Sequence, residues 1–248
     1  MDRIRLRGVS KRFSRLAGAK LLANWGFWQE DSGPNWFWAL DQVDLTLSGY
    51  GKRLAVVGAN GSGKSTLLRI IAGVTRPTYG SVMVNGRIIP LLEVFTGLQP
   101  DLTGRENIYF NGTLMGMRRR EIQRKFDHIV DFAGISSFLD MPVKHYSSGM
   151  RMRLGFSVAS YVDADIILAD EIWSIGDVEF QSKSLRRLEE TRQRGTSIIF
   201  VSNDLDLLRQ NSDEALWLQK GRVAALGPSD LVIKSYLQTA RHNLPPAS

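Results

Sequence analysis

The chain has 248 residues, 43% of them hydrophobic and 23% charged, which is typical of one large α/β domain or two small ones and excludes a disordered chain. It contains no cysteine, which excludes disulfides and cysteine-ligated zinc, and its 3 histidines leave little for a histidine metal site. The formal net charge of +7 favours polyanions such as nucleotides, nucleic acid or an anionic membrane face, without choosing among them.

The N-terminal third alternates short apolar runs with turns. These runs predict three strands, at residues 4–9, 44–47 and 53–57. From Lys64 to Ala72 the apolar residues recur at helical spacing, so a helix is expected directly after a glycine-rich stretch. Residues 80–89 are predicted to form two strands joined by a turn at Asn85-Gly86.

The rest of the chain alternates helices with buried strands. Residues 101–140 are mainly helical in pattern, and residues 150–162 form a further helix. The apolar runs 166–169 and 197–201 are typical of buried parallel strands, with a polar helix over 182–194 between them. A β-ribbon over residues 214–227, turning at Lys220-Gly221, and a short helix are the last predicted elements.

The glycine-rich stretch carries the most specific motif. Residues 58–65 read GANGSGKS and match G-x-x-x-x-G-K-[ST] in full, after a predicted strand and at the start of a predicted helix. Glycines let the backbone approach phosphate, and successive N–H groups at a helix start form a positive nest for its oxygens. Lys64 would place a charge between the β- and γ-phosphates, and Ser65 would offer a hydroxyl to Mg²⁺. An accidental match arises in about one chain in a hundred of this length. The candidate ATP-binding residues are Gly58, Asn60, Gly61, Ser62, Gly63, Lys64, Ser65 and Thr66.

Two acids end the predicted strand at residues 166–169. Asp170 and Glu171 would stand at the carboxyl end of a buried strand, the edge at which open α/β sheets bind ligands. Asp170 is the candidate Mg²⁺ ligand and Glu171 the candidate general base that polarises the attacking water. The alternative is that the two acids only cap the following segment. The complete phosphate-binding motif upstream favours catalysis.

The stretch YSSGMRMR at residues 146–153 precedes a predicted helix. It resembles the signature motif of ATP-binding-cassette proteins, whose usual form is Leu-Ser-Gly-Gly-Gln. Ser147 and Gly149 match that form, whereas Tyr146, Ser148 and Met150 depart from it. A serine before exposed helical N–H groups is also a helix cap and an anion site in its own right.

The resemblance to this family covers nearly the whole chain. VSKRF at residues 9–13 is similar to the segment whose aromatic residue stacks on adenine, which makes Phe13 the candidate, with a core position as the alternative. SIGD at residues 174–177 resembles the D-loop that crosses the dimer interface, so Asp177 is a candidate ATP-site residue. The implied fold is an α/β, RecA-like P-loop core with an antiparallel β-subdomain and a helical subdomain at about residues 95–160.

Three stretches narrow the subfamily. Residues 100–112, 146–160 and 170–183 are similar to the ATPase subunits of bacterial exporters of capsule, O-antigen or teichoic acid chains. The resemblance implies a homodimer bound to two membrane subunits, with two ATP molecules between the phosphate loop of one chain and the signature of the other. Some members carry a second C-terminal β-domain that binds the finished glycan, and we expect this chain to represent the form without it.

Two positions depart from the family pattern. The usual glutamine between the phosphate loop and the signature falls near Glu93, which can accept a hydrogen bond from metal-bound water but adds negative charge. Asn203 in VSND replaces the histidine that normally contacts the γ-phosphate and the attacking water. Because an asparagine amide is shorter and cannot be protonated, we expect slower hydrolysis with ATP binding intact.

An aromatic insert at residues 14–38 interrupts the first sheet. It holds Trp25, Trp28, Trp36 and Trp38, and Trp25 and Trp28 share one face of a predicted helix. Three interpretations remain: contact with the membrane subunit or its substrate, contact with lipid, or packing on its own domain. We favour the first for Trp25 and Trp28 and the last for Trp36 and Trp38.

Two polar clusters can be interpreted either as functional contacts or as ordinary features of a helix. Arg118, Arg119 and Arg120 form either a solvated helix face, which we favour, or a contact for lipid head groups or nucleic acid. Thr103 and Glu106 have the spacing of a capping box and stand where partner contacts are also expected.

The predicted protein is one nucleotide-binding domain over residues 1–248, with a C-terminal helix and tail at 228–248. No apolar run reaches the roughly 18 residues of a spanning helix, and the charged N-terminus lacks a signal-peptide core. We expect a peripheral ATPase at the cytoplasmic face of the inner membrane that powers polysaccharide export. The alternatives are another exported cargo, such as a lipid or drug, and an ATP-dependent dimerisation switch with negligible turnover. A nucleic-acid role is disfavoured, because such cassette proteins usually have two cassettes or long coiled-coil insertions.

Overall fold

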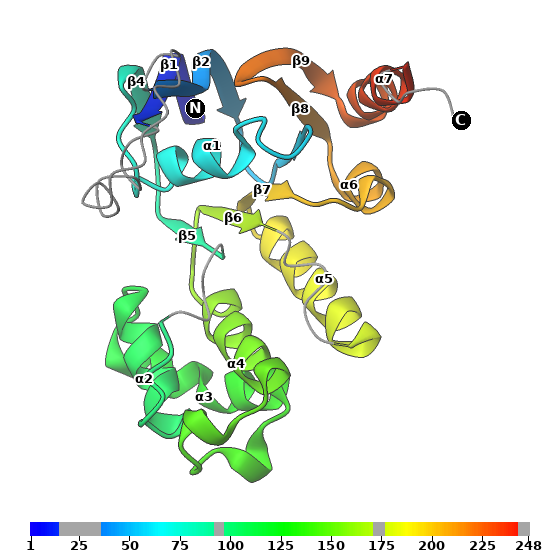
Figure 1. Cartoon of the computed structure of the whole chain (residues 1–248). Helices are drawn as coiled ribbons and strands as arrows, with labels where there is room; N and C mark the ends of the chain where they lie inside the picture. The colour runs from blue at the N-terminus through cyan, green and yellow to red at the C-terminus, as the bar shows by residue number, and fades with distance from the viewer. Residues whose placement is uncertain (15–35, 92–96, 171–176, 243–248) are drawn as a thin grey trace, which may run out of the picture. The chain divides into compact units, whose positions relative to one another are not determined.

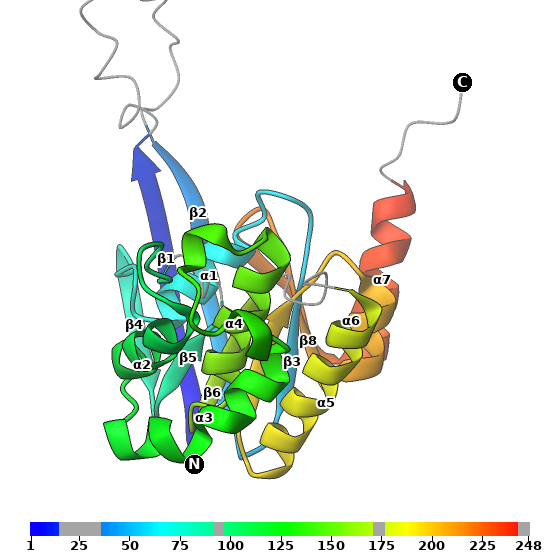
Figure 2. The same cartoon turned by 90° about the horizontal axis from the view of Figure 1, so that it is seen from below.

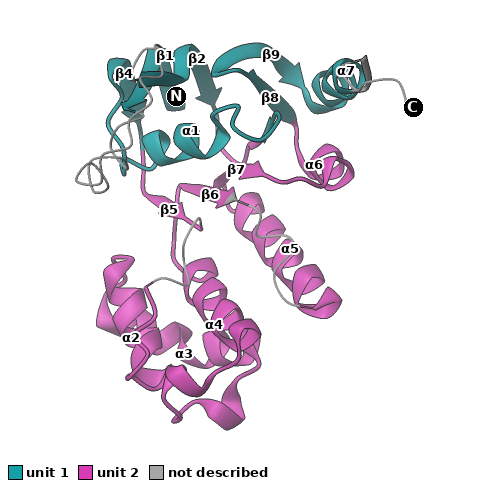
Figure 3. Cartoon of the chain, viewed as in Figure 1, with its two compact units in different colours: residues 1–49, 56–85, 214–248 teal, residues 50–55, 86–213 magenta. Residues whose placement is uncertain are grey.

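The computed structural model describes residues 1–14, 36–91, 97–170 and 177–242. The chain divides into two compact units (Figure 3). Unit 1 comprises residues 1–49, 56–85 and 214–248, and unit 2 comprises residues 50–55 and 86–213. The mixed α/β fold predicted from the sequence is confirmed, with one three-stranded and one six-stranded sheet in the described residues.

Unit 1 contains an antiparallel sheet of order β2-β1-β4 (Figures 1 and 2). Its strands are β1 (Asp2–Ser14), β2 (Trp36–Ser48) and β4 (Tyr79–Val84). Apolar residues alternate with polar ones along β1 and β2, so one face is buried and the other is wet. The strands are longer than predicted, because Ser14 pairs with Trp36 and Phe13 with Phe37. The ends of the predicted insert therefore belong to a paired ribbon, which cross-strand aromatic contacts stabilise.

Unit 1 also contains a short helix, α1 (Lys64–Ile71), and a C-terminal hairpin with its following helix. The hairpin of β8 (Glu214–Gln219) and β9 (Arg222–Pro228) turns at Lys220 and Gly221, whose φ values of 49° and 80° fit a type I′ turn. Helix α7 (Ser229–His242) follows the hairpin and contacts it where the ring of Tyr236 meets Trp217 edge-on at 5.7 Å. The predicted ribbon and its turn are confirmed.

Unit 2 contains the parallel strands β5 (Ile88–Pro90), β6 (Ile166–Asp170) and β7 (Ser197–Val201). Strand β3 (Arg53–Val57) pairs in parallel with β7 through its first residues, and the order of the larger sheet is β5-β6-β7-β3-β8-β9. Helices α5 (Val178–Gln193) and α6 (Leu205–Asn211) follow β6 and β7 along the chain. Residues 166–169 of β6 and all of β7 are buried and rich in isoleucine, as expected for parallel strands covered on both faces.

The predicted strand–turn–strand at residues 80–89 is wrong as a hairpin. Strand β4 pairs with β1, whereas β5 pairs with β6, so Asn85-Gly86 joins two different sheets. Asn85 is held in unit 1, where its side-chain amide donates to the Asp2 carbonyl at 2.8 Å. Arg87 is held in unit 2, where its N–H donates to the Asp165 carboxylate at 2.7 Å. The two anchors separate strands that local alternation alone would pair.

Three helices of unit 2 gather into a group (Figure 1): α2 (Gly104–Leu114), α3 (Arg119–Ala133) and α4 (Ser148–Ser160). The predicted capping box begins α2, with Thr103 accepting from the Glu106 N–H and Glu106 accepting from the Thr103 N–H. Both Thr103 donors hold the pKa of the Glu106 carboxyl below its usual value. The fully buried Asn107 ties this helix to the preceding loop, accepting from the Gln99 N–H and donating to its carbonyl.

The helices of unit 2 share an aromatic core. Phe132 of α3, Phe156 of α4 and Phe180 of α5 meet pairwise with ring centroids 5.6–6.0 Å apart. Two of the three contacts are edge-to-face, the arrangement that the aromatic quadrupole favours. This cluster therefore fixes the positions of α4 and α5 against α3 within the unit.

Phe156→Leu should lower the free energy of unfolding by about 1–2 kcal/mol, because it removes two aromatic contacts and leaves space beside the other rings. Phe138→Leu is the control, since Phe138 is 43% exposed and should lose less than about 0.5 kcal/mol. Urea unfolding of the two variants measures both values. Equal losses would contradict a central role for the cluster.

Candidate functional site

The loop at residues 58–63 joins β3 to α1 in unit 1. Helix α1 begins at Lys64 behind Gly63, and no side chain in the described part of the chain caps it. Its first turn holds no acidic residue either. The N–H groups and the positive end of the helix dipole thus face the loop without a cap or a first-turn acid from the described residues, an arrangement that suits phosphate oxygens.

The three glycines of the loop have different reasons to be glycine. All three have positive φ values: 148° at Gly58, 77° at Gly61 and 108° at Gly63. A Cβ at Gly63 would lie 2.5 Å from the Ala39 carbonyl oxygen, and one at Gly58 would collide with the Leu218 carbonyl. A Cβ at Gly61 would meet no described atom within 4 Å. Gly58 and Gly63 allow the loop to pack closely against the backbone of unit 1, whereas Gly61 borders open space.

Lys64 reaches back over the loop that precedes it. Its ammonium donates to the carbonyls of Gly58 at 2.7 Å and Ala59 at 3.1 Å. These bonds hold the charge within the loop, where a phosphate could be contacted. Ser62 is 5% exposed, and its hydroxyl has no hydrogen-bond partner among the described residues. Asn60 and Ser65 are exposed, and Thr66 is half-buried in the first turn of α1.

The hairpin turn supports the loop. The Gly221 N–H donates to the Ser62 carbonyl at 3.0 Å, and the Gly221 carbonyl accepts from the Asp41 N–H at 2.8 Å. A Cβ at Gly221 would lie 2.9 Å from the Ala39 carbonyl oxygen. Sequence reasoning found this glycine only as a turn residue, because its contacts join segments far apart in the chain.

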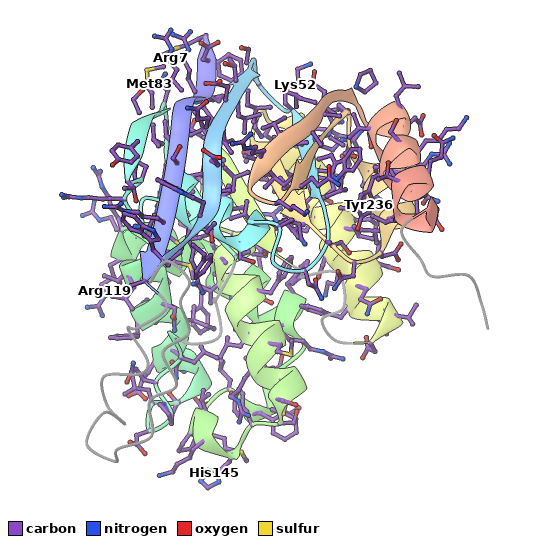
Figure 4. All side chains as sticks on the ribbon, turned by 45° about the horizontal axis from the view of Figure 1, so that its top comes forward. Arg7, Lys52, Met83, Arg119, His145 and Tyr236 are labelled. Carbon is purple, nitrogen blue, oxygen red and sulfur yellow. The ribbon has the colours of Figure 1, made fainter. Side chains whose placement is uncertain are left out.

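A cavity of about 300 Å³ adjoins the loop on the side of α7. Residues 59–62, the end of β8 and the C-terminal half of α7 line it, and Tyr236 is labelled in Figure 4. Trp217 and Tyr236 form its aromatic wall. Sequence reasoning missed this wall, because Trp217 and Tyr236 belong to different elements.

Phe13 lies on β1 and is 38% exposed, so the core alternative is wrong. Its ring lies 6.0 Å from that of Phe37 on β2, and the Lys11 ammonium lies 5.1 Å from its centroid. The exposed pair of rings offers a stacking surface for a planar group. Sequence reasoning missed Phe37, because only the β1–β2 pairing seen in the structure places it opposite Phe13.

Trp36 and Trp38 contact their own unit. The Arg12 guanidinium lies 3.9 Å from the centroid of the Trp36 ring, and Trp38 lies 6.1 Å from Tyr79. Both tryptophans nevertheless remain exposed, at 47% and 43%. Trp25 and Trp28 lie outside the described residues.

Unit 2 carries the polar residues that follow β6 and β7. Asp170 is the last residue of β6 and pairs through its backbone with Val201, the last residue of β7. Asn203 stands two residues further on, exposed in the loop before α6. Asp204 caps α6 by accepting from the Leu207 N–H at 2.9 Å. The structure therefore brings Asp170 and Asn203 to the same edge of the sheet, whereas Glu171 and Glu93 lie outside the described residues.

The signature segment forms the N-terminus of α4. Ser147 caps the helix by accepting from the Met150 N–H at 3.2 Å. A Cβ at Gly149 would meet only one described atom within 4 Å, the Ser147 hydroxyl oxygen at 3.9 Å. No described residue of the chain therefore requires glycine at this position.

Tyr146 anchors the segment. It is 3% exposed, and its hydroxyl donates to the Phe138 carbonyl at 2.7 Å. Burial raises the pKa of the Tyr146 hydroxyl, and the charge of Asp140 adds to the effect. Gly104 leaves room for the tyrosine, because a Cβ there would collide with the hydroxyl. The large residue at the first signature position is thus accommodated by a small one at the start of α2.

Asp177 begins α5. Its carboxylate accepts from the Phe180 N–H at 2.9 Å and forms an ion pair with Arg153 of α4. The guanidinium of Arg153 also lies 5.4 Å from the Phe180 ring. A charged contact therefore links α4 to the start of α5. Sequence reasoning missed Arg153, because nothing local indicates its partner.

Known proteins share this arrangement. Residues 40–174 match the family model described as ABC transporter. The O-antigen export system ATP-binding protein RfbB of Klebsiella pneumoniae is 40% identical over 200 residues, which cover 81% of each chain. The teichoic acids export ATP-binding protein TagH of Enterococcus faecalis is also 40% identical over 200 residues, 81% of this chain but 44% of the longer relative.

Solved structures share the fold at low identity. A dimeric ATP-binding cassette in a post-hydrolysis state, bound to ADP and Pi, has a TM-score of 0.71 at 22% identity and covers 91% of this chain and 98% of its own. The ATP-binding subunit of an ABC transporter has a TM-score of 0.75 at 20% identity, covering 94% and 92%.

Gly221→Ala should weaken ATP binding at least about fivefold and cost about 1–3 kcal/mol of stability, because the methyl group strains the turn and pushes on Ala39. Gly73→Ala is the matched control: its φ is 74°, and no described atom lies within 4 Å of the added Cβ. Gly73→Ala therefore introduces the strain of a positive φ without a steric contact. ATP titration and urea unfolding of both variants measure the difference, and equal ATP affinities would contradict the support of the loop by Gly221.

Proposed function

The chain belongs to the ABC transporter family, and from this premise we propose that it is the ATP-hydrolysing subunit that powers export of a polysaccharide through a separate membrane subunit. The assignment of a polysaccharide as the cargo is supported by the 40% identity to the O-antigen export protein RfbB of Klebsiella pneumoniae over 81% of both chains. The phosphate loop in unit 1 supports the ATPase activity, since its backbone and Lys64 are arranged for a triphosphate.

The proposed reaction is ATP plus water to ADP plus phosphate. Ser65 and Asp170 supply the hard oxygen donors that Mg²⁺ prefers, and the ion would neutralise charge on the β- and γ-phosphates. Glu171 accepts a proton from water as the water oxygen bonds to the γ-phosphorus and the bond to the ADP oxygen breaks. Asn203 would donate an amide hydrogen bond toward the γ-phosphate, and Glu93 would accept one from water beside the Mg²⁺ site.

Each ATP would be completed by a second copy of the chain. We assign Phe13, with Phe37 beside it, to adenine stacking. Ser147 and Gly149 at the start of α4 would face the γ-phosphate bound by the other copy, with Asp177 at the interface. Gly149 supports this assignment, because a glycine that no described residue requires leaves room for a ligand. Residues 1–248 would then act as one nucleotide-binding domain with a helical subdomain at about 95–160.

The membrane contact is expected to be indirect. No helix among the described residues is long and apolar enough to cross a membrane. We place the subunit at the cytoplasmic face of the inner membrane, docked on its membrane subunit, with Trp25 and Trp28 as contacts to that subunit or its substrate. The alternatives of another exported cargo, such as a lipid or drug, share the same ATPase chemistry.

A second candidate is an ATP-dependent dimerisation switch with negligible turnover. It rests on Asn203, because an asparagine amide, unlike the histidine usual at this position, cannot be protonated. Both candidates require ATP binding, and they differ only in the rate of hydrolysis.

Glu171→Gln should reduce Mg²⁺-dependent phosphate release about a hundredfold or more while ATP binding remains, because a neutral amide cannot accept the proton of water. The assay uses the chain with its membrane subunit, and Glu179→Gln is the control, since Glu179 is exposed on α5. Turnover that vanishes only in Glu171→Gln supports the ATPase. No turnover in the parent chain despite tight ATP binding would favour the switch.

Asn203→His should raise turnover about tenfold and introduce a rate dependence on pH near 6–7, because imidazole titrates there and an amide does not. Gln210→His on the exposed side of α6 is the control for a surface histidine. Phosphate release is measured from pH 5.5 to 8.5, a range about three units wide around the histidine pKa. An unchanged or lower rate in Asn203→His would show that asparagine does not limit hydrolysis.

A further inference from the structure

Four arginines line one open cavity of about 1060 Å³ in unit 2. We call it the arginine cleft and define it by Arg87, Arg118, Arg120 and Arg124. Arg118 is the N-cap residue of α3, and Arg120 and Arg124 are one helical turn apart on the same face of that helix. Arg119 does not line the cleft, so the three consecutive arginines do not act as one surface (Arg119 is labelled in Figure 4).

The two acids of the cleft share one lysine. Glu121 and Asp163 also line it, and Lys125 donates to the first at 2.9 Å and contacts the second at 3.0 Å. Among the described residues, no carboxylate pairs with Arg118, Arg120 or Arg124. The four arginines and Lys125 outnumber Glu121 and Asp163, so the cleft has a net positive charge, and this repulsion between like charges opposes folding.

Contacts within unit 2 fix the position of the Arg87 side chain. Its guanidinium donates to the Met115 carbonyl, and the half-buried side chain reaches the cleft from the segment before β5. Gly116 makes room for it, because a Cβ there would lie 3.0 Å from the nearest guanidinium nitrogen. These contacts hold the Arg87 guanidinium at the cleft.

The start of α3 adds to the positive field. No side chain in the described part of the chain caps this 15-residue helix, and the acid in its first turn, Glu121, is bound to Lys125. Helical N–H groups and guanidinium groups therefore meet at the same cleft. Both kinds of donor fit the tetrahedral oxygens of phosphate, and guanidinium groups can bind them in pairs.

We propose that the arginine cleft binds a phosphate-bearing anion, separately from the phosphate loop of unit 1. The anion is either the head group of an anionic lipid or a soluble phosphorylated compound, since both present the same oxygens. The cavity is large enough for several phosphate groups or for a phosphate with its organic substituent.

The test compares two variants of the full chain with equal tendencies to form helix. Arg120→Gln with Arg124→Gln removes two cleft residues, and Arg119→Gln with Arg186→Gln removes two exposed arginines outside the cleft. One arm measures pyrophosphate binding by calorimetry in a Lys64→Ala background, which removes binding by the phosphate loop. The other arm measures co-sedimentation with phosphatidylcholine vesicles in which about a third of the lipid is phosphatidylglycerol. Thermal unfolding checks that each variant is folded.

We expect the cleft variant to lose at least about tenfold in affinity in one arm and the control variant to lose less than about threefold. Loss confined to pyrophosphate identifies a soluble ligand, and loss confined to vesicles identifies a lipid head group. Equal losses in the two variants would indicate diffuse surface charge and overturn the proposal. Unchanged binding in both arms would overturn it as well.

Discussion

The backbone of the loop at residues 58–63 is the constraint on which the structure of unit 1 depends. Its N–H groups can converge on a phosphate only if three glycines adopt positive φ values, and such a backbone needs support from outside the loop. That support comes from the β8–β9 turn and from the end of β2, through Gly221 and Ala39. Under the proposed function, the hairpin would therefore support nucleotide binding through the backbone of its turn.

The N-termini of helices α1 to α6 divide into two classes. Helices α2, α4, α5 and α6 begin with side-chain caps from Thr103, Ser147, Asp177 and Asp204. Helices α1 and α3 have no such cap among the described residues, and each instead faces basic side chains. Since a side-chain oxygen and a phosphate oxygen compete for the same N–H groups, the uncapped helices are the ones best prepared for anions.

Residues around the signature segment accommodate its departure from the usual family sequence. Tyr146 is large where the family usually has leucine, and the start of α2 compensates with Gly104 and with the Phe138 carbonyl as acceptor. Ser147 serves as a helix cap in this structure, and the proposed contact with the γ-phosphate would add a binding role to the same residue. Arg153 then connects this helix to Asp177 and so to the segment that would cross the dimer interface.

Local sequence determined the phosphate loop, the buried strands β6 and β7, the β8–β9 turn and the capping box, because each depends on residues close together in the chain. The separation of β4 from β5, the pairing of Phe37 with Phe13, the contact of Gly221 with the loop and the grouping of Arg87 with Arg118, Arg120 and Arg124 depend on residues far apart. Only the tertiary structure decided these, because hydrophobic periodicity records which face is buried and not which distant segment lies against it.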